Sequence, residues 1–191
     1  MNRRQEVARL ADWCRVPLGS GATIAEVGAG DGAFARECLH WAGPTGRVFA
    51  TELEGQKHQQ LCRRLSRQGG EIGPVASTAA TSGLPVGECD AVVLRAVYHH
   101  FTQPRAMAAD LFAALRPGGA LAIVDFPARW WLTLFSRPKD VPADRGGHGV
   151  PAVVVGRELT AAGFALERDG RPWRWDFYCS LFRKPGVAPQ P

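Results

Sequence analysis

Short apolar runs alternate with stretches of helical periodicity along most of this chain. The apolar runs predict five strands, over residues 22–27, 47–52, 72–77, 90–95 and 120–125. Apolar residues spaced three and four apart predict the accompanying helices, over residues 2–15, 32–41, 54–68, 103–115 and 152–162. Strands that alternate with helices are typical of a doubly wound parallel sheet with helices on both faces.

The pattern changes after Phe126. Residues 127–151 are irregular, rich first in tryptophan and then in glycine. Residues 164–169 and 175–182 then predict a terminal antiparallel hairpin. Together these elements predict an α/β fold: a mostly parallel, seven-stranded sheet with an antiparallel C-terminal strand. Two details are local: a turn at 116–119, and Thr102 as the cap of the fourth helix.

Composition narrows the class of protein. Hydrophobic residues make up 46% of the 191 residues and charged residues 21%, as in ordinary globular domains. The net charge of +5 comes from arginines spread over separate predicted elements, which favours a solvated surface over a nucleic-acid face. Five scattered cysteines without a CxxC pair indicate reduced thiols in a cytoplasm and predict no metal site. No apolar run approaches the ~20 residues of a membrane span.

Residues 24–34 are the most informative segment, because an apolar strand stops there in a glycine turn and continues as a helix. Gly28 and Gly30 let the backbone adopt positive φ and approach a ligand closely. The start of the following helix presents unpaired N–H groups at the same point. The segment therefore predicts a nucleotide-like cofactor at the carboxyl edge of the sheet, beside the first and fourth strands.

Glu52 ends the second predicted strand, about twenty residues beyond the glycine turn. An acidic side chain at this position accepts hydrogen bonds from ribose hydroxyls. The alternative is a solvated carboxylate at a strand end. Nicotinamide dinucleotides and S-adenosylmethionine are both bound by this arrangement, so turn and acid alone leave two cofactor classes open.

Three segments resemble one family, the class I S-adenosylmethionine-dependent methyltransferases, in its small-molecule branch. Residues 26–32 are similar to its first motif, 90–101 to its fourth-strand motif and 115–121 to the turn before its fifth strand. The terminal hairpin also matches, so the resemblance covers residues 22–183. It implies a Rossmann-like sheet in an S-adenosylmethionine-binding methyltransferase domain at 21–185. An N-terminal helix and loop (1–20) would precede this domain, and a disordered tail (186–191) would follow it.

The resemblance also implies roles for single residues in binding the cofactor. The turn would cradle the methionine and ribose, Glu52 would hold the ribose, and Leu53 would pack on the adenine. The implied cofactor residues are Glu26, Gly28, Ala29, Gly30, Glu52, Leu53, Thr78, Ala79 and Arg95. Glu26 would meet the methionine ammonium or brace backbone N–H groups, and Arg95 would act through its carbonyl. Family members often hold the adenine amino group with an acid, but none stands between Glu71 and Glu88.

Candidate catalytic residues follow the fourth strand, where the resemblance places the methyl acceptor. A general base is needed only if that acceptor must lose a proton. Tyr98 and His99 are candidates, as is His148 in a glycine-rich loop; packing or solvent exposure is the alternative for each. One of His99 and His100 is expected to point into the core and the other outward. Asp125 would bind acceptor or cap a loop.

These features together predict methyl transfer from S-adenosylmethionine to a small acceptor, apolar or aromatic in character. Trp130 and Trp131 would pack, line the acceptor pocket or form an interface. A second interpretation is a non-catalytic partner subunit that binds the cofactor. A homodimer is compatible with either interpretation. A nicotinamide-dependent oxidoreductase is disfavoured, because no lysine stands four residues after a tyrosine. Charge alone supports an RNA methyltransferase.

Overall fold

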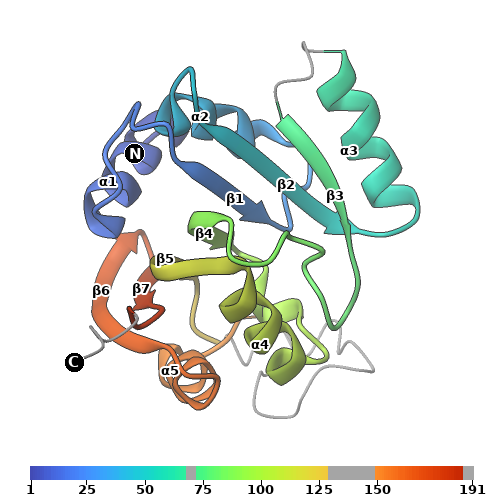
Figure 1. The fold of residues 1–191 in the computed structure, drawn as a ribbon. Helices are drawn as coiled ribbons and strands as arrows, with labels where there is room; N and C mark the ends of the chain where they lie inside the picture. The colour runs from blue at the N-terminus through green and yellow to red at the C-terminus, as the bar shows by residue number, and fades with distance from the viewer. Residues whose placement is uncertain (68–71, 129–148, 187–191) are drawn as a thin grey trace, which may run out of the picture.

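The computed structural model describes residues 1–67, 72–128 and 149–186. Its centre is a seven-stranded sheet with the order β3-β2-β1-β4-β5-β7-β6 (Figure 1). The strands are β1 (Thr23–Val27), β2 (Arg47–Leu53), β3 (Ile72–Ser77), β4 (Cys89–Arg95), β5 (Leu115–Asp125), β6 (Ala165–Arg174) and β7 (Phe177–Arg183). β1 to β5 pair in parallel, whereas β7 is antiparallel to both β5 and β6. The predicted α/β fold class is confirmed.

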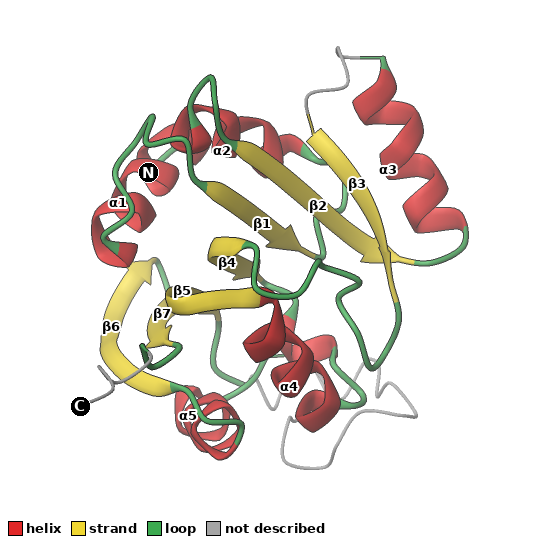
Figure 2. Cartoon of the chain, in the orientation of Figure 1, coloured by secondary structure: helices red, strands yellow, loops and turns green. Residues whose placement is uncertain are grey.

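Helices cover both faces of the sheet (Figure 2). They are α1 (Arg3–Cys14), α2 (Ala33–Ala42), α3 (Gln56–Ser66), α4 (Pro104–Ala114) and α5 (Ala152–Ala161), with a 3-10 turn, η1 (Tyr98–His100). The first three helices pack on one face, and α4 and α5 pack on the other. Because both faces are covered, β4 is apolar on both sides. Its Ala91 and Val93 join the first core, and its Val92 and Leu94 join the second.

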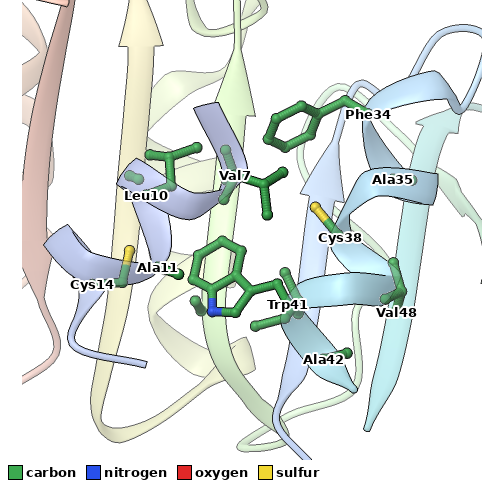
Figure 3. Packing of buried hydrophobic residues seen from close by; sticks show 14 of the residues in the cluster. Val7, Leu10, Ala11, Cys14, Phe34, Ala35, Cys38, Trp41, Ala42 and Val48 are labelled. Carbon is green, nitrogen blue, oxygen red and sulfur yellow. The ribbon is translucent and has the colours of Figure 1, made fainter. Parts of the chain in front are cut away.

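α1 belongs to the same core as the sheet rather than to a separate unit. Val7 and Leu10 of α1 face Trp41 and Cys38 of α2 across this core (Figure 3). The buried Trp41 ring donates its indole N–H to the Val16 carbonyl at 2.7 Å. This bond satisfies the one polar atom of a large buried side chain and fixes the loop that leads into β1.

β3 forms in spite of its Gly73-Pro74 pair because it lies at the edge of the sheet and pairs only with β2. A proline lacks the N–H that each residue of an interior strand donates to one of its two neighbours. An edge strand tolerates that loss, because one of its sides has no neighbouring strand. The triplet 153–155, which suits a strand by composition, lies within α5, where Val155 is buried and Val153 is exposed. The helical spacing of the segment therefore prevails over β propensity.

Two local predictions were wrong. Residues 116–119 belong to β5 rather than to a turn before it, because Gly118 and Gly119 exchange backbone hydrogen bonds with Lys184 beyond β7. The register with β4 shifts at this point. Thr102 does not cap α4: the N-cap is Gln103, without a side-chain capping bond. Pro104 occupies the first turn of α4, as expected.

Candidate cofactor and active site

The glycine turn is fixed to the neighbouring strand by its backbone. The N–H groups of Gly28 and Ala29 both donate to the Thr51 carbonyl, at 3.0 and 2.8 Å. Gly28 and Gly30 have φ values of +74° and +57°, which glycine adopts without the penalty that a Cβ atom brings. The ends of β1 and β2 are thereby held together at the carboxyl edge of the sheet.

The two glycines face different surroundings. A Cβ atom on Gly28 would lie 2.4 Å from Cγ2 of Val97, in the loop after β4. A Cβ atom on Gly30 would have no heavy atom within 4 Å. Gly28 therefore permits close packing of two loops, whereas Gly30 borders open space at the point where a ligand would approach.

Glu52 is held by the same turn. One oxygen of its carboxylate accepts the Gly30 N–H at 2.9 Å, and the other accepts the Leu53 N–H at 2.9 Å. The side chain is only 8% exposed, so these two bonds orient a largely desolvated charge. A carboxylate has about four lone-pair sites, which leaves acceptor capacity toward the cavity beside it.

That cavity has a volume of about 330 Å³ and lies over the carboxyl ends of β1, β2 and β3. Its volume falls at the lower end of the roughly 300–1,000 Å³ that small-molecule sites occupy. Five of the predicted cofactor residues line it: Gly28, Glu52, Leu53, Thr78 and Ala79. His100, which the sequence placed near the acceptor after the fourth strand, also lines it. Sequence reasoning missed Lys57, Thr102 and Met107, which line it as well. Position alone, shortly after β4, was the available signal for Thr102.

Glu26 does not line this cavity and is buried within β1. Burial raises the pKa of its carboxyl from 4.5 to about 8, while the Arg95 guanidinium and a hydrogen bond from the Ala35 backbone lower it. Its Oε2 has no hydrogen-bond partner among the described residues. Bracing of backbone N–H groups, one of the two predicted roles, is thus present at Ala35, and the unpartnered oxygen stays available to a cation.

Glu26→Gln is expected to flatten the pH dependence of stability. Between pH 4.5 and 8 the folded chain keeps a proton that the unfolded chain has released. The stability from this group is therefore complete below pH 4.5 and is lost as the pH rises through 8. From pH 6 to pH 8 the wild type should lose about 2 kcal/mol more unfolding free energy than the variant. Urea unfolding at both pH values measures this difference, and equal losses would contradict it. Glu37→Gln in α2 is the matched control.

Arg95 points away from this cavity and toward α1. Its guanidinium pairs with the Glu6 carboxylate at 2.9 Å and lies 4.3 Å from the centre of the Phe34 ring. The second oxygen of Glu6 accepts the Trp173 indole N–H at 3.1 Å. The guanidinium thus ties the N-terminal helix to the end of β4, a contact that the sequence did not predict. Whether the Arg95 carbonyl binds cofactor stays a prediction.

A smaller cavity of about 110 Å³ lies on the α1 side of the same edge, between Arg95, Val124 and Phe177. Ala96 lines it and has a φ of +51°, which is uncommon for a residue with a side chain. The Ala96 N–H donates to the Val124 carbonyl at 2.8 Å, which holds the residue in this conformation. Backbone strain of this kind is concentrated at functional sites.

His99 is buried and paired with Asp125 at the end of β5. Its Nδ1 lies 2.9 Å from Oδ1 of Asp125, whose fully buried carboxylate also accepts the backbone N–H groups of His99 and Phe126. The His99 ring packs against the rings of His100 and Phe126, with centroids 4.0 and 4.8 Å away. The expected division holds: His99 points inward, and His100 is exposed beside the cavity.

Tyr98 does not line the cofactor cavity. It is fully buried in the α4 and α5 core, and its hydroxyl donates to Glu158 at 2.9 Å. This environment gives Tyr98 a packing role, so its place among the catalytic candidates finds no support. His148, Trp130 and Trp131 lie outside the described residues. Within the described ranges, no group of three His, Cys, Asp or Glu side chains is placed to hold a metal ion, and no helix is long and apolar enough to cross a membrane.

Comparison with known proteins identifies the family. A model of the methyltransferase domain matches residues 25–123, slightly more than half of the chain, so the chain belongs to this family. No curated protein matches it. Among solved structures it is similar to a SAM-dependent methyltransferase from Aquifex aeolicus, at 18% identity and a TM-score of 0.74, covering 94% of this chain and 89% of that one.

Two further solved structures share the fold. The YcgJ protein from Bacillus subtilis has 15% identity and a TM-score of 0.69, with 90% of this chain and 72% of that chain covered. A SAM-dependent methyltransferase from Methanosarcina mazei has 16% identity and a TM-score of 0.65, with 87% and 93% covered. Identities this low show a common fold.

The family decides between the two cofactor classes that the glycine turn left open. The chain is a methyltransferase, an enzyme whose cofactor is S-adenosylmethionine. The described residues fit this cofactor. The Gly30 side of the turn is open, Glu52 keeps free lone pairs beside the cavity, and a buried oxygen of Glu26 lacks a partner.

Proposed function

We propose that the 330 Å³ cavity holds the adenosyl part of the cofactor and that the acceptor is a small molecule bound at the ends of β4 and β5. Glu52 carries this proposal, because its carboxylate is already oriented by Gly30 and Leu53 and borders the cavity. Leu53 and Ala79 supply apolar surface for a purine. When bound, the cofactor supplies an electrophilic methyl group. The residues around it then align the reactants and exclude water.

We further propose that His99 removes a proton from the acceptor. Because Nδ1 faces Asp125, it is assigned the ring proton, and the lone pair is then on Nε2. A neutral imidazole held in one tautomer by a carboxylate is a typical general base. Phe126 packs on the His99 ring and meets Phe177 edge to face at 5.2 Å, so aromatic surface surrounds the base. This favours an apolar or aromatic acceptor with an acidic O–H or N–H group.

His99→Ala is expected to lower kcat by about 10²–10⁴-fold, the usual contribution of a general base, and to leave the Kd for S-adenosylhomocysteine within about threefold. Methyl transfer from labelled cofactor to a panel of phenols and aromatic amines measures kcat, and calorimetry measures Kd. His40→Ala, on the exposed side of α2, is the matched control. Unchanged turnover would remove His99 from the mechanism.

We also propose that the protein acts in the cytoplasm and does not require nucleic acid. All five cysteines are free thiols, which are typical of a reducing compartment. Several arginines that contribute to the positive charge pair with carboxylates of this chain: Arg15 and Arg183 with Glu167, Arg47 with Glu88, and Arg116 with Asp90. Such pairs favour a locally neutralised surface over a phosphate-binding one.

A further inference from the structure

Among the described side chains that line the cofactor cavity, few are dedicated hydrogen-bond acceptors. Glu52 is the only carboxylate among the described residues that line the cavity, and both of its oxygens accept backbone N–H groups near the ribose position. Adenine presents an amino group at position 6, which needs an acceptor. No other side chain in this lining is an obligatory acceptor.

Neighbouring acceptors are already engaged elsewhere. Asp110 lies one turn beyond Met107 in α4, but its carboxylate accepts both the backbone N–H and the hydroxyl of Ser82. The Ser77 carbonyl accepts the Glu54 N–H at 2.9 Å. The Thr81 carbonyl accepts the Thr78 N–H, also at 2.9 Å. These two carbonyls and the Asp110 carboxylate are therefore already engaged within the protein.

Lys57 also lines this cavity, and its ammonium carries the opposite charge to the Glu52 carboxylate. An ammonium has three donors and no acceptor, so it cannot receive a hydrogen bond from an amino group. No described residue forms a hydrogen bond or ion pair with its Nζ. The Thr78 hydroxyl already accepts the backbone N–H groups of Ala80 and Thr81. The Thr102 hydroxyl, which also lines the cavity, can either donate or accept.

We propose that this base subsite accepts a 6-oxopurine in place of adenine, with Lys57 as the residue that donates to the 6-oxo group. A 6-oxopurine offers an acceptor at position 6 and a donor at N1, which suit an ammonium and a threonine hydroxyl respectively. The ligands are therefore S-inosyl as well as S-adenosyl thioethers and sulfoniums. This inference rests on the proposed function, because it assumes that the purine occupies this cavity.

Calorimetry with S-adenosylhomocysteine and S-inosylhomocysteine tests the inference on the purified full chain. We expect both compounds to bind, with Kd values within about tenfold of each other. A site built to receive the adenine amino group through a carboxylate or a carbonyl rejects the oxo analogue far more strongly, because that group then faces another acceptor. An inosyl Kd more than tenfold weaker would overturn the inference. If the adenosyl compound binds and the inosyl compound does not, only this inference fails. If neither binds, the proposed cofactor site fails with it.

Two variants locate the effect at Lys57. Lys57→Met should raise the Kd of the inosyl compound about 10-fold, which corresponds to one charge-assisted hydrogen bond, and should change the Kd of the adenosyl compound less than threefold. Lys57→Glu should create a preference for the adenosyl compound, because a carboxylate accepts a hydrogen bond from the amino group. Arg64→Met, on the exposed surface of the same helix, is the matched control and should leave both Kd values unchanged. Equal weakening of both compounds by Lys57→Met, or no change in either, would overturn the assignment of Lys57.

Discussion

Gly28→Ala is expected to destabilise the protein by about 3 kcal/mol and to abolish measurable cofactor binding. Two costs add. The φ of +74° is unfavourable for any residue with a Cβ atom, and the new atom would lie 2.4 Å from Val97 Cγ2 and 3.0 Å from its Cβ. Since the Val97 side chain is short and branched, it cannot turn away, and the loop after β4 must move. That loop forms one wall of the cavity.

A double variant separates the two costs. Val97→Ala removes the contacting methyl groups. The double variant Gly28→Ala with Val97→Ala should therefore recover the stability lost to overpacking. The remaining loss of about 1–2 kcal/mol would come from the positive φ of residue 28. Gly30→Ala provides the comparison, because its Cβ meets nothing within 4 Å and only strain should appear. Urea unfolding of the four proteins measures these differences. If the unfolding free energy of Gly28→Ala is within about 0.5 kcal/mol of the wild type, roughly the scatter of surface substitutions, the predicted clash with Val97 is wrong.

Glu52→Ala is expected to weaken S-adenosylhomocysteine binding by about 100-fold or more. The ribose would lose charge-assisted hydrogen bonds, each worth about 1.5–3 kcal/mol, and the Gly30 N–H would lose its partner. Glu52→Gln keeps one oxygen acceptor and should give an intermediate loss. Glu54→Ala is the control, because Glu54 is exposed and does not line the cavity. This variant should bind S-adenosylhomocysteine with the wild-type Kd. A Glu52→Ala Kd within threefold of the wild type would refute the role of Glu52.

The parts of the site that the sequence predicts are those in which neighbours along the chain determine geometry. The turn between Val27 and Ala33 needs only glycines after a buried strand, and Glu52 needs only its place at the end of the next strand. The sheet follows from the same logic, because apolar runs covered on both faces must lie inside. The three motifs occur in the order found in the methyltransferase family, and this order indicated the family from sequence alone.

The parts that the sequence did not predict depend on contacts between distant segments. Glu6 and Arg95 are 89 residues apart, and the pairing of His99 with Asp125 joins η1 to the end of β5. Nothing local distinguishes Lys57 from the other basic residues of α3, although it alone among them lines the cavity. The prediction of a turn at residues 116–119 was wrong for the same reason, because backbone hydrogen bonds with the distant Lys184 make this segment part of the sheet.

The decisive experiment for the cofactor site is a crystal structure of the complex with S-adenosylhomocysteine. We expect the compound in the cavity beside Gly28, with both ribose hydroxyls about 3 Å from the Glu52 carboxylate and the purine against Leu53 and Ala79. Density for the compound at any other place, or a Glu52 side chain turned away from the sugar, would contradict it.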